Sequence, residues 1–453
     1  MLLKAPTVTV ALSFLLTSTI AIAQTTDVTK KELFLPPKIW NVPDGNDFSS
    51  NDSEFSNQRK VESDDIALFW SKEYGDDPAT NPNPNKRFDP STALKECERF
   101  YRSYVDDLEF VDKGHSLTDK YKALIFVIGG DEGTAFGGGT DQVESLWTPA
   151  SRINRTPYGV LAHELGHSFQ YIVHADGAWG FSSAPKGSRA NPIAEMTSQY
   201  MLWQVYPEWM TFEHYHLVDY LKQTHLAFLH EDNQYHSPYV LEYWSNKRGV
   251  DFVGKLWREA KQGEDPVMAY KRLNSLSQAQ FNDEMFDAAR HFITWDMKRV
   301  EKVAAPYANQ HTSTLNEAGD GWYRIAPNNC PQNYGYNGIK LKVPAPNTKV
   351  TFDFKGIAGT EGFRAIDVAK AGWRYGFLAV KEDGSRVYGQ TFYAVNGTAE
   401  FTVSEKTTFL WLVVMGAPTD HSAHIADGKP DNDEQWPYQI KLSGTSLDDS
   451  MIR

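Results

Sequence analysis

The sequence predicts an α+β fold in which a mixed sheet and a helical lobe precede an all-β sandwich. Strand-like apolar runs are interspersed with helical patterns up to about residue 150. Helical patterns then dominate to about residue 300. Past about residue 320, short runs rich in valine and aromatic residues are separated by glycine turns, which is typical of antiparallel strands. The change of period places one domain at 63–310 and a second at 320–447.

The first residues have the layout of a secretory signal peptide. One lysine precedes an apolar run from Val8 to Ile20, and small residues follow at Ala21-Ile22-Ala23. We therefore expect residues 1–23 to be removed and the protein to be secreted. No later segment reaches the ~20 apolar residues that span a bilayer, so no membrane anchor is expected. Residues 24–62 are polar and broken by proline and glycine, which predicts an extended or partly ordered leader.

The amino-acid composition excludes some classes of binding partner. The formal net charge of −13 argues against nucleic acid and against an anionic membrane surface, because both bind through an excess of lysine and arginine. We expect a monomer. Two cysteines, Cys97 and Cys330, can form one disulfide or remain buried thiols, and the sequence leaves both open.

The elements before the central motif are predicted from apolar patterning. Residues 66–70 and 123–128 read as buried strands, and 92–110 has helical spacing. Between them and the motif lies TAFGGGTDQVESLWTP, at 134–149. It lacks the GxxxxGK[ST] pattern of a phosphate loop and no helix follows it directly, so its glycines are predicted to form a turn between two short extended pieces.

Two capped helices are predicted next. Thr156-Pro157 supplies a cap and a first-turn proline for a helix ending near Gly177, and Asn191-Pro192 does the same for a helix ending before Pro207. Helical patterns continue at 239–244, 252–260 and 281–300, and strands are predicted at 349–354, 377–381, 399–403 and 409–415.

The first capped helix contains HELGHSFQ, at 163–170. His163 and His167 lie one turn apart on one helix face, and Glu164 is next to that face, where it can reach a water bound to a shared ion. An ordinary polar turn is the alternative. A catalytic zinc needs a third protein ligand. His174 misses the metzincin spacing by one residue, about 100° of helix, and is read as a polar helix-end residue.

Glu195 is the better candidate for the third ligand. It lies in the first turn of the second capped helix, where a carboxylate also complements the helix dipole. Without the HELGH motif, this interaction with the helix dipole would be the preferred explanation for Glu195. With HELGH upstream, a metal ligand is the stronger interpretation.

HELGH followed by a glutamate on the next long helix resembles the gluzincin clan of zinc metallopeptidases. The resemblance implies a zincin-like domain whose sheet ends in an edge strand, within 134–148, and a Zn²⁺ held by His163, His167 and Glu195 with Glu164 as general base. The clan often carries an acid four residues after the third ligand to orient a histidine. This chain has Gln199 there, which leaves that orientation open.

The stretch YHSPYVLEYW, at 235–244, resembles a gluzincin segment in which a tyrosine stabilises the oxyanion. Tyr235 matches that position, although Pro238 replaces a glycine, and His236 is the alternative. Either residue can instead cap or pack against the following helix.

HELGHSFQ, LWLVVMGAPTDH and DNDEQWPYQ together resemble the Svx and AvrXca group of secreted virulence proteins of plant-pathogenic bacteria. The resemblance implies action in the plant extracellular space. We therefore expect a secreted zinc-dependent endopeptidase whose partners are extracellular proteins or peptides, those of a plant host included.

A secreted protein that binds a glycan or host surface, with an inactive HExxH helix, is the alternative. Trp373, Trp411 and Trp436 are either a sugar-stacking platform or core residues, with the core favoured. The acidic stretch 427–434 has the composition of a calcium loop without EF-hand spacing, so it is read as a solvated loop.

Overall fold

A computed structural model describes residues 30–130 and 133–452, and residues 31–453 form one compact unit. The predicted signal peptide, 1–23, lies outside the described residues. The class is α+β, as predicted, with a mixed sheet, a set of helices and an antiparallel sandwich. Within the part of the chain that is described, every helix is either too short or too polar to cross a bilayer.

The first sheet has the order β1-β2-β3-β5-β4. Its three central strands are parallel to one another, and the two edge strands run antiparallel to their neighbours. The central strands are buried on both faces, which is why β2 and β3 are continuous apolar runs rather than alternating patterns, whereas β5 is buried although it contains polar residues. The strands are β1 Lys60–Glu62, β2 Ile66–Trp70, β3 Ala123–Ile128, β4 Phe136–Thr140 and β5 Val143–Pro149.

The polar leader packs against this sheet. Ile39 and Phe55 are buried beside Phe69 and Phe126, on the face of the sheet opposite the helices. Its last residues, 60–62, form β1. A few apolar residues in a polar segment are a weak sequence signal. The contribution of residues 31–62 to the core is therefore seen only in the folded structure.

The glycine run forms an edge strand, and the prediction of a turn at these glycines was wrong. Gly137, Gly138 and Gly139 lie in β4, and the turn comes afterwards, where Asp141 has a φ of 54°. A Cβ on Gly137 would lie 1.7 Å from the carbonyl oxygen of Glu164. The glycines allow β4 to approach the motif helix at a distance that no side chain permits.

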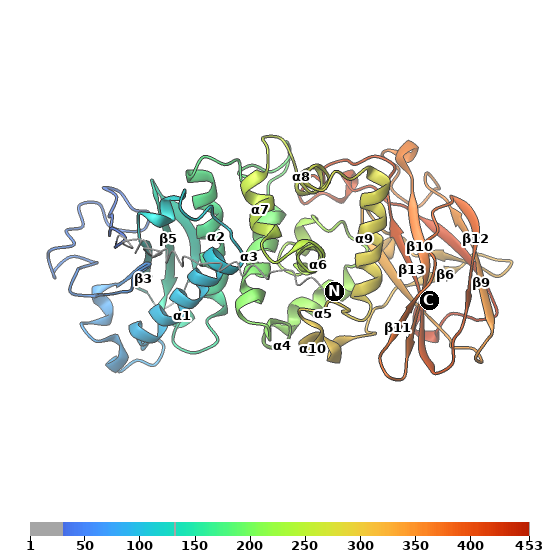
Figure 1. Cartoon of the computed structure of the whole chain (residues 1–453), viewed down its shortest axis with the longest axis horizontal. Helices are drawn as coiled ribbons and strands as arrows, with labels where there is room; N and C mark the ends of the chain where they lie inside the picture. Colours follow the sequence, from blue (N-terminus) through green and yellow to red (C-terminus); the bar gives the residue numbers. More distant parts are fainter. Residues whose placement is uncertain (1–29, 131–132, 453) are drawn as a thin grey trace, which may run out of the picture. The chain divides into compact units, whose positions relative to one another are not determined.

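The motif helix, α2, covers the sheet and packs against α3 (Figure 1). Its N-cap is Tyr158, so it begins two residues later than predicted, after Thr156-Pro157. For α3 the prediction is confirmed, with Asn191 at the N-cap and Pro192 in the first turn. The helices are α1 Pro90–Arg102, α2 Gly159–Ala175, α3 Pro192–Val205, α4 Trp209–Phe212, α5 His214–Lys222, α6 Tyr239–Arg248, α7 Phe252–Glu259, α8 Pro266–Leu273, α9 Gln278–Phe292 and α10 Glu301–Ala304.

The C-terminal part is an antiparallel β-sandwich, as predicted. One sheet has the order β11-β10-β13-β8 and the other β12-β9-β14-β7-β6, with a shared apolar core between them. The strands are β6 Leu315–Glu317, β7 Trp322–Ile325, β8 Tyr336–Leu341, β9 Lys349–Gly356, β10 Trp373–Lys381, β11 Arg386–Tyr388, β12 Asn396–Thr402, β13 Thr407–Gly416 and β14 Tyr438–Ser443.

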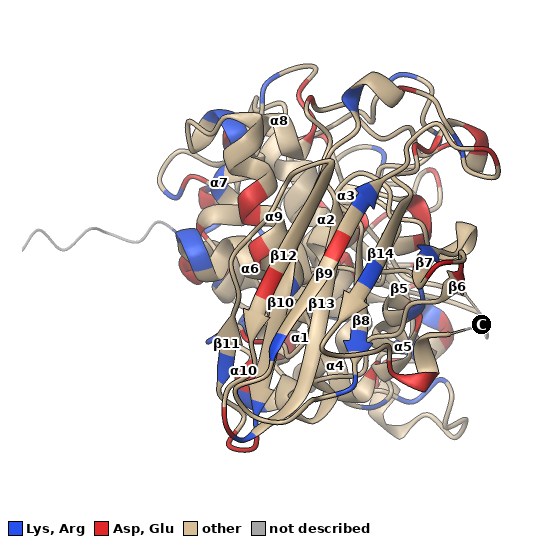
Figure 2. Cartoon of the chain, turned by 90° about the vertical axis from the view of Figure 1, so that its right-hand side faces the viewer, with Lys and Arg blue, Asp and Glu red and all other residues tan. Residues whose placement is uncertain are grey.

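The two sheets differ in what covers them. Strands β10 and β13 contact α9 on one face and the sandwich core on the other, so LWLVVMG is apolar without alternation. Strands β9 and β12 alternate buried and exposed positions, and their exposed side carries charges of both signs, among them the Lys349–Glu400 ion pair (Figure 2).

The tryptophans of the sandwich are core residues. Trp373, Trp411 and Trp436 are each at most 1% exposed, which confirms the core interpretation and removes the proposed sugar-stacking platform. Cys97 and Cys330 are buried free thiols in two different apolar clusters.

Candidate metal centre

Three side chains from α2 and α3 converge on one point. The Nε2 atoms of His163 and His167 are 3.2 Å apart, and Glu195 Oε2 lies 3.2 Å from the first and 3.1 Å from the second. Atoms that bind a tetrahedral zinc at its usual ~2.0–2.1 Å are about 3.3 Å from one another. The two nitrogens and the carboxylate oxygen therefore fit one Zn²⁺ in both spacing and donor chemistry.

The outer nitrogen of each histidine faces an amide oxygen. His163 Nδ1 lies 3.2 Å from Gln199 Oε1, and His167 Nδ1 lies 3.2 Å from Gln170 Oε1. An amide oxygen only accepts, so each Nδ1 carries a proton, and in the neutral imidazole this leaves the lone pair of each Nε2 free to bind an ion. Gln199 thus orients His163, the role that the sequence left open.

Neighbours fix the orientation of both amides. Gln199 Nε2 donates to the carbonyl oxygen of Tyr235 at 3.1 Å and lies 3.0 Å from His216 Nε2. Gln170 Nε2 donates to the carbonyl oxygen of Ala194 at 2.8 Å. Sequence reasoning did not single out Gln170 or His216. Gln170 is three residues beyond His167, a spacing that places it on a neighbouring face of α2 and was available as a signal.

Glu164 lies beside the three converging atoms, partly buried under β4. Burial raises the pKa of its carboxyl group, while the neighbouring His163 and His167 oppose this. Burial acts in the same direction on Glu195. With no ion bound and both histidines protonated, hydrogen bonds from their Nε2 atoms outweigh burial and hold the pKa of Glu195 well below its usual value. The two carboxyl groups therefore differ in proton affinity, and Glu164 is the one suited to take up a proton.

The structure separates the two candidates for the oxyanion donor. The Tyr235 ring stacks on His163, with 6.1 Å between ring centroids, and burial together with Glu195 raises the pKa of its hydroxyl group to about 12. His236 instead contacts His216, with 2.7 Å between their Nδ1 atoms. Tyr235 is therefore adjacent to the centre, whereas His236 reaches it only through His216 and Gln199.

His174 is exposed at the end of α2, where its Nδ1 lies 3.2 Å from the carbonyl oxygen of Ala178. His174 is not one of the three converging side chains, and it is a polar residue at the end of the helix, as the spacing predicts. The centre thus consists of three ligand candidates, one adjacent carboxylic acid and one phenol, which is the set needed to activate water against a polarised carbonyl group.

The chain belongs to the family of unknown function DUF6055, whose model matches residues 25–449. A comparison with curated proteins finds no match.

Two solved structures are similar at low TM-scores. One is the C-terminal family 22 carbohydrate-binding module of Clostridium thermocellum Xyn10B, with 12% identity, a TM-score of 0.19, and coverage of 31% of this chain and 83% of that one. The other is the M60 catalytic domain with the CBM51-1 and CBM51-2 domains of Clostridium perfringens ZmpB, with 9% identity, a TM-score of 0.30, and coverage of 87% and 60%.

Proposed function

We propose that this member of the DUF6055 family is a zinc-dependent endopeptidase. The observation that carries the proposal is the convergence of His163 Nε2, His167 Nε2 and Glu195 Oε2 within 3.2 Å of one another. Three protein ligands leave a position open for water or substrate, as catalytic zinc requires. The resemblance of HELGH and the following glutamate helix to the gluzincin clan supports the same reading.

Bound zinc would supply a Lewis acid that polarises the scissile carbonyl group and lowers the pKa of a water molecule towards ~7. Glu164 accepts the proton of the attacking water and passes it to the leaving amine. Its raised pKa suits both steps, because the carboxyl group must hold a proton between them. Tyr235, which retains its proton at neutral pH, donates a hydrogen bond to the oxyanion.

The sheet provides a place for an extended peptide. Among the described residues β4 pairs only with β5 and stands at the end of the strand order, so its other edge can take a further strand, although the N–H of Gly138 already donates to Ser168 Oγ. Three consecutive glycines leave this edge without side chains next to Glu164. A substrate strand added here would lie beside the metal centre.

The proposed substrates are extracellular proteins, those of a plant host included. The signal-peptide layout of residues 1–23 and the resemblance to the Svx and AvrXca group support this location. Burial of Trp373, Trp411 and Trp436 removes one sugar-stacking platform that the alternative glycan-binding function could have used.

Glu164→Gln tests the proposal. Glutamine keeps the size of the side chain but cannot take up the water proton, and all three ligands remain. Zinc content, measured by elemental analysis, should stay at the wild-type level. Cleavage of a peptide library should fall by roughly 10²–10⁴-fold, the usual contribution of a general base.

His163→Ala is the matched comparison, because it removes a ligand and should lose zinc and cleavage together. Wild-type cleavage rates in the Glu164→Gln variant would refute the mechanism. Metal-replete wild-type protein without zinc at His163 would refute the proposed function altogether.

A further inference from the structure

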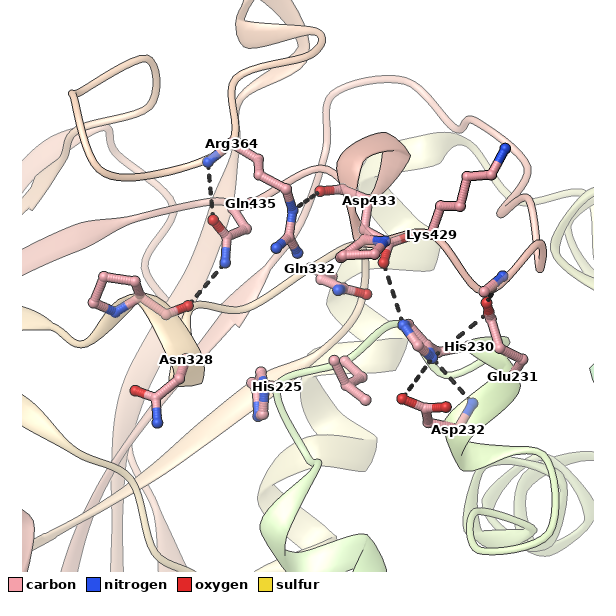
Figure 3. Close-up of a pocket in the computed structure, with 14 residues that line it drawn as sticks. His225, His230, Glu231, Asp232, Asn328, Gln332, Arg364, Lys429, Asp433 and Gln435 are labelled. Carbon is pink, nitrogen blue, oxygen red and sulfur yellow. Dashed lines mark hydrogen bonds and ion pairs between the residues drawn. The ribbon is translucent and has the colours of Figure 1, made fainter.

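A second group of metal-ligating side chains lies where the loop between β13 and β14 meets the segment before α6. His230, Glu231 and His424 each offer a ligand atom, and these atoms lie within 4.8 Å of one another. His424 is 193 residues away from Glu231, so only the fold brings them together. Figure 3 shows His230 between Asp433 on one side and Glu231 with Asp232 on the other.

Glu231 is the centre of this group. Its Oε2 lies 2.9 Å from His424 Nε2 and 3.6 Å from His230 Nδ1. Its Oε1 accepts the backbone N–H of Gly428 at 2.6 Å, which fixes the carboxylate. One carboxylate oxygen therefore faces one nitrogen from each of two imidazole rings.

Asp433 faces the other nitrogens of the same rings. Its Oδ2 is 3.3 Å from His230 Nε2, and its Oδ1 is 3.7 Å from His424 Nδ1. A carboxylate on the outer nitrogen of a histidine is the arrangement that orients metal-binding imidazoles. Asp433 is 6% exposed, so the reading of 427–434 as a uniformly solvated loop does not hold at this residue.

The charges of the two carboxylates are not balanced by fixed cations. Within residues 30–130 and 133–452, the ion-pair partners of Glu231 and Asp433 are histidines only. Arg364 is close, but its Nε donates to the backbone carbonyl oxygen of Asp433. Two largely buried carboxylates then need either protonated histidines or a bound cation.

We propose that His230, Glu231 and His424 bind a second Zn²⁺, with Asp433 orienting the two histidines. Imidazole nitrogens with a carboxylate suit zinc, whereas Ca²⁺ takes six to eight oxygen ligands. A cavity of about 270 Å³ lined by His230, Glu231 and Asp433 opens beside the group and gives access to it. His230 Nδ1 also accepts the N–H of Asp232 at 3.1 Å, and a bound ion takes the place of that hydrogen bond.

This ion ties together two segments that lead to the first centre. Glu231 is four residues before Tyr235. In the other loop, the carbonyl oxygen of Ala426 accepts the N–H groups of Arg189 and Ala190, just before α3 and Glu195. The second zinc would fix the loop of the β-sandwich against the segments that position these two residues.

The test uses the full chain with the first centre removed by His163→Ala and His167→Ala. After zinc loading and removal of free metal, elemental analysis should find one zinc per chain. Adding His424→Ala should abolish it. His421→Ala is the matched control, since His421 lies in the same loop but pairs with Asp265, and it should retain the zinc.

Glu231→Gln provides a second variant in case His424→Ala does not fold. Glutamine can still accept the N–H of Gly428, but it lacks the anionic ligand, so zinc should be lost while the circular dichroism stays at the wild-type level. Zinc should also raise the melting temperature of the background protein and not that of the His424→Ala variant.

The outcome is independent of the peptidase proposal. One zinc per wild-type chain that is lost in His163→Ala but kept in His424→Ala overturns the second site and leaves the first intact. One zinc with the opposite dependence supports the second site and refutes the peptidase centre. Absence of zinc from the folded background protein would show that protonated histidines supply the compensating charge, and it would overturn the inference.

Discussion

The wild-type protein should lose stability as pH rises, because the buried carboxyl group of Glu144 ionises. The variant Glu144→Gln should not show this loss. Glu144 lies on β5, is 2% exposed, and its Oε1 has no hydrogen-bond partner among the described residues. Burial raises the pKa of its carboxyl group from 4.5 to about 8, and the more distant Lys31 offsets this only in part. The folded protein therefore keeps Glu144 protonated at pH values where the unfolded chain has released the proton.

The sign and size of the effect follow from this shift. Stability from Glu144 is fully present below pH 4.5, the pKa expected in the unfolded chain, and is lost as pH rises through about 8. At ~1.4 kcal/mol per pH unit, the full shift corresponds to about 5 kcal/mol of unfolding free energy. Glutamine is neutral at every pH. The unfolding free energy of the variant should therefore equal that of the wild type at about pH 4 and exceed it by several kcal/mol at pH 9.

Urea unfolding followed by tryptophan fluorescence at pH 4, 6, 7.5 and 9 measures this difference. Glu361→Gln is the matched control, because Glu361 is exposed and its variant should track the wild type. The reasoning would be refuted if the difference in unfolding free energy between Glu144→Gln and the wild type were the same at all four pH values.

Two further predictions concern the metal centre. Gly137→Ala places a methyl group 1.7 Å from the carbonyl oxygen of Glu164, so β4 must move, with a loss of about 1–3 kcal/mol of stability. Gly138→Ala, with no atom within 4 Å of the new Cβ, should leave the stability near the wild-type value; equal losses of stability in the two variants would contradict the close packing of β4. Gln199→Leu removes the acceptor for His163 Nδ1–H and should weaken zinc binding roughly 10–100-fold in a competition titration with a chelator, while unchanged affinity would show that Gln199 does not orient His163.

The sequence by itself determined the features that depend on local spacing. Residues four apart share a helix face, so HELGH predicted how His163 and His167 would lie. The Asn191-Pro192 cap placed Glu195 in the first turn of α3, and the change of period near residue 320 located the sandwich. The first two signals are each contained within about one turn of helix, and the third depends only on the period of short apolar runs along the chain.

Only the tertiary structure decided the features that depend on close approach between distant segments. Three consecutive glycines predict a turn, because glycine is common in turns. Their small size also suits an edge strand packed closely against α2, and no local feature of the sequence distinguishes these two structures. LWLVVMG cannot show by its pattern that both faces of β13 are covered.

The side chains around the two centres follow the same rule. Gln199 meets His163 across two helices, and His424 meets Glu231 between two domains. Such contacts arise from the packing of whole elements, whose geometry is set by many residues at once. A sequence pattern therefore gives the ligands of one helix pair, while the residues that orient them and the second cluster emerge only when the chain is folded.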